Sequence, residues 1–116
     1  MPFYAAVSSA QGWLALLNKD TATAIAAYAH AVELWNDAHG EQHVLTGWGY
    51  MLLGKSYAQA GQNDKALEQM RKGLNILNQV IGPSDPKYLA AQISYSQVLD
   101  QSGEHDEAVR VRNSAR

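Results

Sequence analysis

Residues 53–66 read LGKSYAQAGQNDKA, and the spacing of residues in this stretch recurs along the chain. Ala24, Ala66 and Ala108 lie 42 positions apart, as their numbers show, and pairs of glycines follow the same interval. A fixed period of this size indicates a stack of similar units, each burying an apolar face against its neighbours. The repeat constrains the architecture strongly and the chemistry hardly at all.

Apolar residues recur at helical spacing between the turns of the chain. Ile25, Tyr28, Ala29 and Val32, for example, follow the i, i+3, i+4, i+7 pattern of an amphipathic helix. The predicted helices run at about 3–17, 21–40, 43–60, 64–81, 86–102 and 106–116. The 116 residues are therefore expected to form one all-α domain, an α-α superhelix of three antiparallel helix pairs, with repeats at about 1–40, 41–82 and 83–116.

Residues that end and start helices stand at these predicted boundaries. Gly40 is placed to end the second helix, and Gly61 to reverse the chain after the third. The predicted N-caps are Asp20 or Thr21 for the second helix, Asn63 or Asp64 for the fourth, and Asp85, followed by Pro86, for the fifth.

Composition narrows the classes of function. Nine basic and 11 acidic residues give a net charge of −2, which excludes the basic footprint of a nucleic-acid-binding protein. The absence of Cys excludes disulfides and thiolate metal sites. No apolar run approaches the ~20 residues of a membrane span. The apolar start lacks a basic residue before Lys19, unlike a signal peptide, so a cytoplasmic location and no membrane partner are expected.

A family resemblance rests on the stretch quoted first. Leu53, Gly54, Tyr57, Gly61 and Ala66 occur as L-G-x-x-Y-x-x-x-G-x-x-x-x-A, which resembles the tetratricopeptide repeat. The 42-residue period and the Gly-Pro-Ser-Asp-Pro loop at 82–86 resemble the kinesin-light-chain type of that repeat. The resemblance covers nearly the whole chain. It implies a non-enzymatic protein- or peptide-binding scaffold whose concave groove is lined by the first helix of each repeat.

Helical spacing then selects the side chains that this groove would present. The expected partner-binding residues are Trp13, Trp48, Met51, Lys55, Gln59 and Gln97, with Ser9, Leu16, Ile93 and Gln101 on the same face. Aromatic and Met side chains beside Lys and Gln suit an extended or helical peptide, with apolar anchors and amide hydrogen bonds. Alternatively, Trp13, Trp48 and Met51 only pack adjacent units together.

The family's usual peptide-binding residues are not all present. Kinesin-type repeats carry Asn one turn inside the first helix, where this chain has Ala10, Leu52 and Ser94. The Lys, Asn and Arg set with which chaperone-binding relatives hold a C-terminal carboxylate is also absent. Binding of chaperone tails is therefore not expected.

No pattern in the chain indicates catalysis, so no catalytic residue, cofactor or enzyme activity is expected. His39 and His43 have the four-residue spacing of metal ligands on a helix. However, Gly40 lies between them and should break that helix, and His43 aligns with the helix-start residue Asp85. No metal site is therefore expected, and a metal-dependent hydrolase is the weakest alternative function.

The last predicted helix departs from the other units. Arg112 stands at the position of Tyr28 and Met70. The helix could be a polar terminal cap, the chain could be part of a longer array, or a second copy could cover an apolar surface. That surface would consist of Ile93, Val98, Val109 and Val111. Self-association, or assembly into a larger complex, is thus the alternative to binding a protein or peptide partner of unknown identity.

Overall fold

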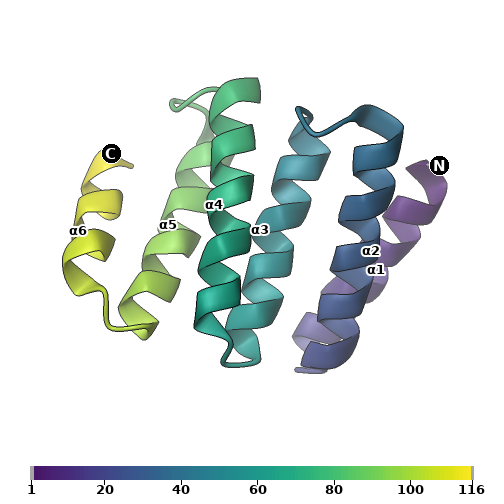
Figure 1. Cartoon of the computed structure of the whole chain (residues 1–116), viewed down its shortest axis with the longest axis horizontal. Helices are drawn as coiled ribbons and strands as arrows, with labels where there is room; N and C mark the ends of the chain where they lie inside the picture. The colour runs from purple at the N-terminus through teal and green to yellow at the C-terminus, as the bar shows by residue number, and fades with distance from the viewer. Residues whose placement is uncertain (1, 116) are drawn as a thin grey trace.

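The computed structural model describes residues 2–115, which form six α-helices and contain no strand. The helices are α1 (Pro2–Leu17), α2 (Thr21–His39), α3 (Val44–Gln59), α4 (Asn63–Val80), α5 (Pro86–Gln101) and α6 (His105–Ser114). They follow one another across an elongated body of 40 × 30 × 19 Å, with α1 and α6 at opposite ends (Figure 1). The all-α superhelix expected from the sequence is confirmed.

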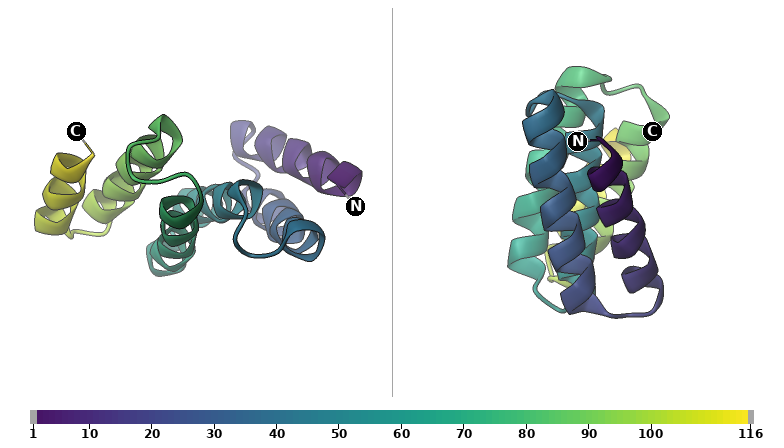
Figure 2. Two further views of the ribbon diagram at one scale, coloured as in Figure 1. Left: turned by 90° about the horizontal axis from the view of Figure 1, so that it is seen from above. Right: turned by 90° about the vertical axis from the view of Figure 1, so that its right-hand side faces the viewer.

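Each helix packs against the next one in the chain, so the molecule is a stack of hairpins. The first helices of successive pairs also touch, α1 against α3 and α3 against α5. In Figure 1, α2 and α4 lie nearer the viewer than α1 and α5, and Figure 2 shows the stack winding as it advances from α1 to α6. The first helices therefore share one face of the stack.

Small residues allow the two helices of a pair to approach closely. A Cβ added to Gly54 of α3 would lie 2.5 Å from Met70 Cγ and 2.9 Å from the carbonyl oxygen of Ala66, both on α4. A Cβ added to Gly12 of α1 would lie 2.7 Å from the ring of Tyr28 on α2. Tyr28 and Met70 are almost completely buried beside these glycines. Motif residues thus serve packing, as the repeat pattern predicts.

Equivalent residues start α3 and α5. His43 Nδ1 accepts a hydrogen bond from the backbone N–H of Leu45 at 3.1 Å, and Asp85 Oδ1 accepts one from Lys87 N–H at 2.8 Å. The prediction that His43 is a helix-start residue is confirmed. Asp20 caps α2 in the same manner, through the N–H of Thr23.

The turn between α3 and α4 differs from the expectation. Neither Asn63 nor Asp64 caps α4: the N-cap is Gln62, whose side chain makes no capping hydrogen bond. Gly61 has a φ of +79°, and this left-handed residue reverses the chain so sharply that Asn63 is already helical. The backbone N–H of Gln62 closes the turn on the carbonyl of Tyr57 at 2.9 Å.

The last helix pair is built differently from the others. α6 has 10 residues, against 18 in α4, and Ala108 is its one buried residue within the described chain. Because α6 is short, Ile93 is 45% exposed, whereas the equivalent Met51 is 2% exposed. The expectation that Val98 contributes to an exposed surface is wrong, because Val98 lies in the core between α4 and α5.

Arg112 on α6 makes an ion pair instead of filling the core. Its Nη1 donates to Asp100 Oδ2 at 2.6 Å, and His105 Nδ1 lies 3.0 Å from Asp100 Oδ1. These two hydrogen bonds, that of His105 first, lower the pKa of the Asp100 carboxyl. The third unit is therefore closed by a polar cluster where the first two units use a buried aromatic or thioether side chain.

Candidate protein-binding groove

The shared face of α1, α3 and α5 is hollowed in two places that adjoin each other. The first hollow, of about 390 Å³, lies among α1, α3 and α5. The second, of about 680 Å³, lies among α1, α2 and α3. Trp13 and Lys55 line both hollows, so the two form one continuous groove along the inner face. We call this surface the inner groove.

Four of the six predicted binding residues meet in the first hollow. Trp13, Lys55, Gln59 and Gln97 line it together, although they come from three different helices. Trp48 lines the second hollow and also packs against buried Leu52 and Leu53. Trp48 therefore packs adjacent units together, as the alternative interpretation predicts, and also lines the groove. Trp13, in contrast, is 52% exposed and projects into the groove.

Met51 does not belong to the groove, which corrects the expectation from helical spacing. It is buried, and its sulfur and Cγ fill the space opposite Gly73 of α4. Helical positions 48, 52, 55 and 59 share the inner face, while position 51 is rotated toward α4. Because Gly73 has no side chain, the two helices come close enough for Met51 to be enclosed between them.

The sequence also missed several lining residues. Leu17, Ala58 and Ser94 line the first hollow beside the predicted Leu16 and Gln101. Ala6 and Ala10 line the second beside the predicted Ser9. Ala10 and Ser94 stand where kinesin-type repeats carry Asn, and that alignment is the signal that could have placed them; the small or apolar side chains of the others gave none. Ile93, which was expected on this face, lines neither hollow.

The charged side chain that lines the groove is a lysine. No charged residue occurs in α1, and Lys55 is the one charged residue of α3. Lys87, near the start of α5, borders a small adjoining hollow with Trp48. The acid of α5, Asp100, is held by His105 and Arg112 of α6. Among the described residues no carboxylate lines either hollow, so the groove is suited to a ligand that carries a negative charge.

The amides of the groove differ in how far they are already engaged. Gln59 Nε2 donates to the carbonyl oxygen of Leu16 at 3.1 Å and so joins α3 to the end of α1. The same carbonyl also accepts the backbone N–H of Lys19 at 3.1 Å, so Gln59 supplies a second hydrogen bond at the C-terminus of α1. Gln97 and Gln101 are exposed along the first hollow and face solvent.

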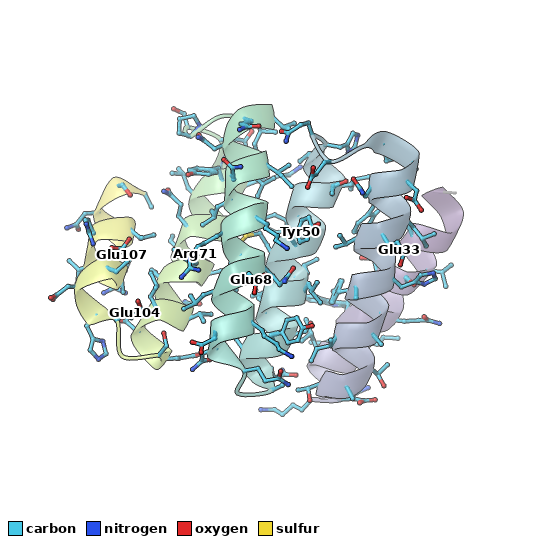
Figure 3. All side chains as sticks on the ribbon, viewed as in Figure 1. Glu33, Tyr50, Glu68, Arg71, Glu104 and Glu107 are labelled. Atoms are coloured by element: carbon cyan, nitrogen blue, oxygen red, sulfur yellow. The ribbon has the colours of Figure 1, made fainter. Side chains whose placement is uncertain are left out.

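The other face of the stack has a different chemistry. Glu33, Glu68 and Arg71 project from α2 and α4 toward the viewer in Figure 3. Glu68 pairs with Lys72 at 4.0 Å, as the spacing of these residues predicts, and Arg71 Nε donates to the hydroxyl of Tyr95 at 3.0 Å. The outer face thus carries charged side chains of both signs, unlike the inner groove.

His39 and His43 lie at the turn between α2 and α3. The rings of His39 and His43 stack with centroids 4.3 Å apart, and His43 Nδ1 is used as a helix cap. In the described part of the chain, no three side chains of the metal-ligating types gather where they could hold an ion. Nor does any described helix have the length and hydropathy needed to cross a membrane.

The fold defines a helical-repeat protein of the α-α superhelix class. The tetratricopeptide repeat family model matches residues 5–79 and 50–115, so the chain belongs to the tetratricopeptide repeat family. Members of this family are generally non-enzymatic scaffolds for protein interaction.

Two kinds of relative support the kinesin-light-chain type of repeat. The chain is 33% identical over 98 residues to the Arabidopsis thaliana protein KINESIN LIGHT CHAIN-RELATED 3. The match covers 84% of this chain but 15% of that protein. Two crystal structures of kinesin-light-chain TPR-like repeats from Podosopora anserina have the same fold, with TM-scores of 0.88 and 0.86 at 17% and 18% identity. They cover 99% and 98% of this chain, which spans 55% and 54% of theirs.

Proposed function

We propose that the chain is a scaffold that holds an extended or helical segment of a protein partner in the inner groove. The observation that carries the proposal is that Trp13 and Lys55 line both hollows and join them into one surface. A continuous groove along three helices fits a segment of chain, whereas separate pits would fit separate small ligands.

The apolar part of the groove supplies the anchor. Trp13 is half exposed, and Leu16 and Leu17 stand beside it in the first hollow. Covering such surface with a partner's apolar side chain is worth about 25 cal/mol per Å² removed from water. Because helices of a packed stack hold these residues, little conformational freedom is lost on binding.

The charge of the groove selects among apolar segments. Lys55 lies between the two hollows with no carboxylate beside it, so an acidic residue of the partner would complete the charge balance. Gln97, Gln101 and Ser94 offer donors and acceptors along the first hollow. We therefore expect a segment in which a large apolar residue is followed or preceded by Asp or Glu.

A displayed library of random peptides tests this proposal. We expect peptides selected on the wild-type chain to combine apolar and acidic residues and to lose at least about tenfold in affinity for the double variant Trp13→Ala, Lys55→Ala. Both residues are exposed, so the variant should keep its helical circular dichroism and melting temperature.

The matched control is the double variant Val80→Ala, Lys72→Ala, which removes one exposed apolar and one exposed basic residue from α4. It should bind the selected peptides as tightly as the wild type. Equal binding by all three proteins, or an equal loss in both variants, would contradict the inner groove as the binding surface.

The cytoplasmic location expected from the sequence belongs to the same proposal. The peptides that the groove selects would define the class of partner.

A further inference from the structure

The outer edge of α1 is apolar and uncovered. Val7 and Leu14, one heptad apart on this helix, are 42% and 59% exposed, and neither belongs to a hydrophobic core cluster of the described residues. Gln11 lies between them and is also exposed. These residues face away from the inner groove, whose hollows they do not line. We call Val7, Gln11 and Leu14 the leading edge.

Alignment of the repeats shows which residues of the second and third units are equivalent to the leading edge. With the 42-residue period, Val7 aligns with Gly49 and Ala91, and Leu14 aligns with Ser56 and Val98. All four aligned residues are buried. A Cβ on Gly49 would lie 2.8 Å from Val32 of the preceding unit, so this position faces the preceding second helix. The leading edge is therefore the surface on which a second helix of another unit packs.

The opposite end of the stack carries the complementary surface. Val109 of α6 aligns with Ile25 and Leu67, which pack into the cores that α2 and α4 form with the following unit. Val109 is 48% exposed, since no described residue follows it in the stack. Asn113, one turn further on, aligns with Arg71. We call Val109 and Asn113 the trailing edge.

One side-chain contact inside the stack maps by register onto a residue of each edge. Arg71 donates a hydrogen bond to Tyr95 across the α4–α5 boundary, and the period places Asn113 and Gln11 at these two positions. Two amides can satisfy each other where Arg and Tyr do so inside the stack. α1 carries no charge, and Arg110 and Arg112 of α6 are paired with Glu107 and Asp100, so neither of these arginines would face the apolar leading edge without a partner.

We propose that a second copy of this chain covers the leading edge with its trailing edge, continuing the superhelix head to tail. The contact would repeat the α2–α3 and α4–α5 boundaries that the chain already contains. It is heterologous, so it leaves one free edge at each end and can add further copies. Because α6 has only 10 residues, the contact is smaller than the internal ones, and we expect association between about 10 µM and 1 mM.

Sedimentation velocity on the 116-residue chain and two charge variants tests this geometry. The wild type should form dimers and larger species as its concentration rises. Leu14→Asp damages the leading edge alone and Val109→Asp the trailing edge alone, so each variant by itself should be monomeric, and two damaged edges would repel each other. A mixture of the two variants retains one intact pair of edges and should form a 1:1 dimer that grows no further.

The remaining outcomes contradict the proposal. A wild type that is monomeric up to about 1 mM would show that this surface receives some other partner, such as a further repeat of a longer protein. Association of either variant alone, or a mixture that stays monomeric, would exclude the head-to-tail contact. Val80→Asp places a charge on an equally exposed apolar residue away from both edges and should associate like the wild type. Its failure to do so would indicate a general effect of charge.

Discussion

The middle and last units place opposite kinds of residue at the same position of the repeat. Met70 of α4 has no exposed surface and lies against Gly54, whereas the side chain of Arg112 on α6 is 41% exposed and pairs with Asp100. The difference reflects neighbours: α4 is covered by α3 and α5, while α6 has α5 alone. The crossing of α3 and α4 is thus filled by an apolar side chain, whereas an ion pair joins α5 and α6.

Exchanging the residues at these two positions should give the largest difference in the free energy of unfolding. Met70→Arg places an unpaired charge in the core and should destabilise the chain by at least about 4 kcal/mol, enough to prevent folding of many domains of this size. Arg112→Met should change the free energy of unfolding by no more than about 1 kcal/mol. Urea unfolding followed by circular dichroism measures both. Similar costs for the two variants would contradict the assignment of the core.

The helix crossings give the next largest effect. Gly54 in the middle unit aligns with Ser96 in the last, a buried residue whose hydroxyl donates to the carbonyl oxygen of Ile93 at 2.7 Å. Gly54→Ser should cost about 1–3 kcal/mol by forcing Met70 and Ala66 apart. Ser96→Gly should cost about 1 kcal/mol, the usual helix penalty of glycine. If the two changes cost the same in urea unfolding, the close approach at Gly54 is not what fixes the pair.

The turns between the two helices of each pair also differ among the units. Lys19 has a φ of +60° and occupies the position that Gly61 and Gly103 fill in the other units. A side chain in this left-handed conformation costs about 1 kcal/mol, so Lys19→Gly should stabilise the chain by up to about that amount. Gly61→Lys should destabilise it by a similar amount. A Lys19→Gly variant that melts at a lower temperature than the wild type would contradict this interpretation.

The smallest expected effect concerns the polar cluster of the last unit. Hydrogen bonds from His105 and then Arg112 lower the pKa of Asp100 below its ordinary value of 3.8. A lowered folded-state pKa stabilises the fold above pH 3.8, and this contribution is lost as pH falls through the lower folded value. The amide signals of α6 in NMR spectra should therefore shift toward disordered values in that range.

Substitution of one cluster member tests this pH dependence. In Asp100→Asn the acid-dependent shift of the α6 signals should be absent, while the signals of α3 and α4 behave as in the wild type. An unchanged pH dependence in Asp100→Asn would mean that another carboxyl group controls α6.

Much of the fold could be predicted because its determinants are local. Gly54, Tyr57, Gly61 and Ala66 have a fixed spacing, and each has one packing or turn role that the spacing reveals. The N-cap of α4 could not be predicted in this way. Gln62 occupies the cap position because of the backbone conformation of Gly61. Its side chain gives no signal.

The groove was predicted less completely than the fold. Trp13, Lys55, Gln59 and Gln97 were placed together correctly by helical spacing, but the same spacing wrongly included Met51. Whether Met51 faces the groove or α4 depends on how closely α3 and α4 approach, and that distance is set by Gly73, 22 residues away in sequence. The pairing of Arg112 with Asp100 likewise depends on the packing of two helices.

The inner groove is tested most directly by an NMR titration of the ¹⁵N-labelled chain with a peptide that it selects. The account predicts that the indole N–H signal of Trp13 and the backbone signals of Lys55 and Gln97 shift most, while those of Glu33 and Glu68 on the outer face stay unchanged. Shifts confined to the outer face, or spread evenly over all six helices, would contradict it.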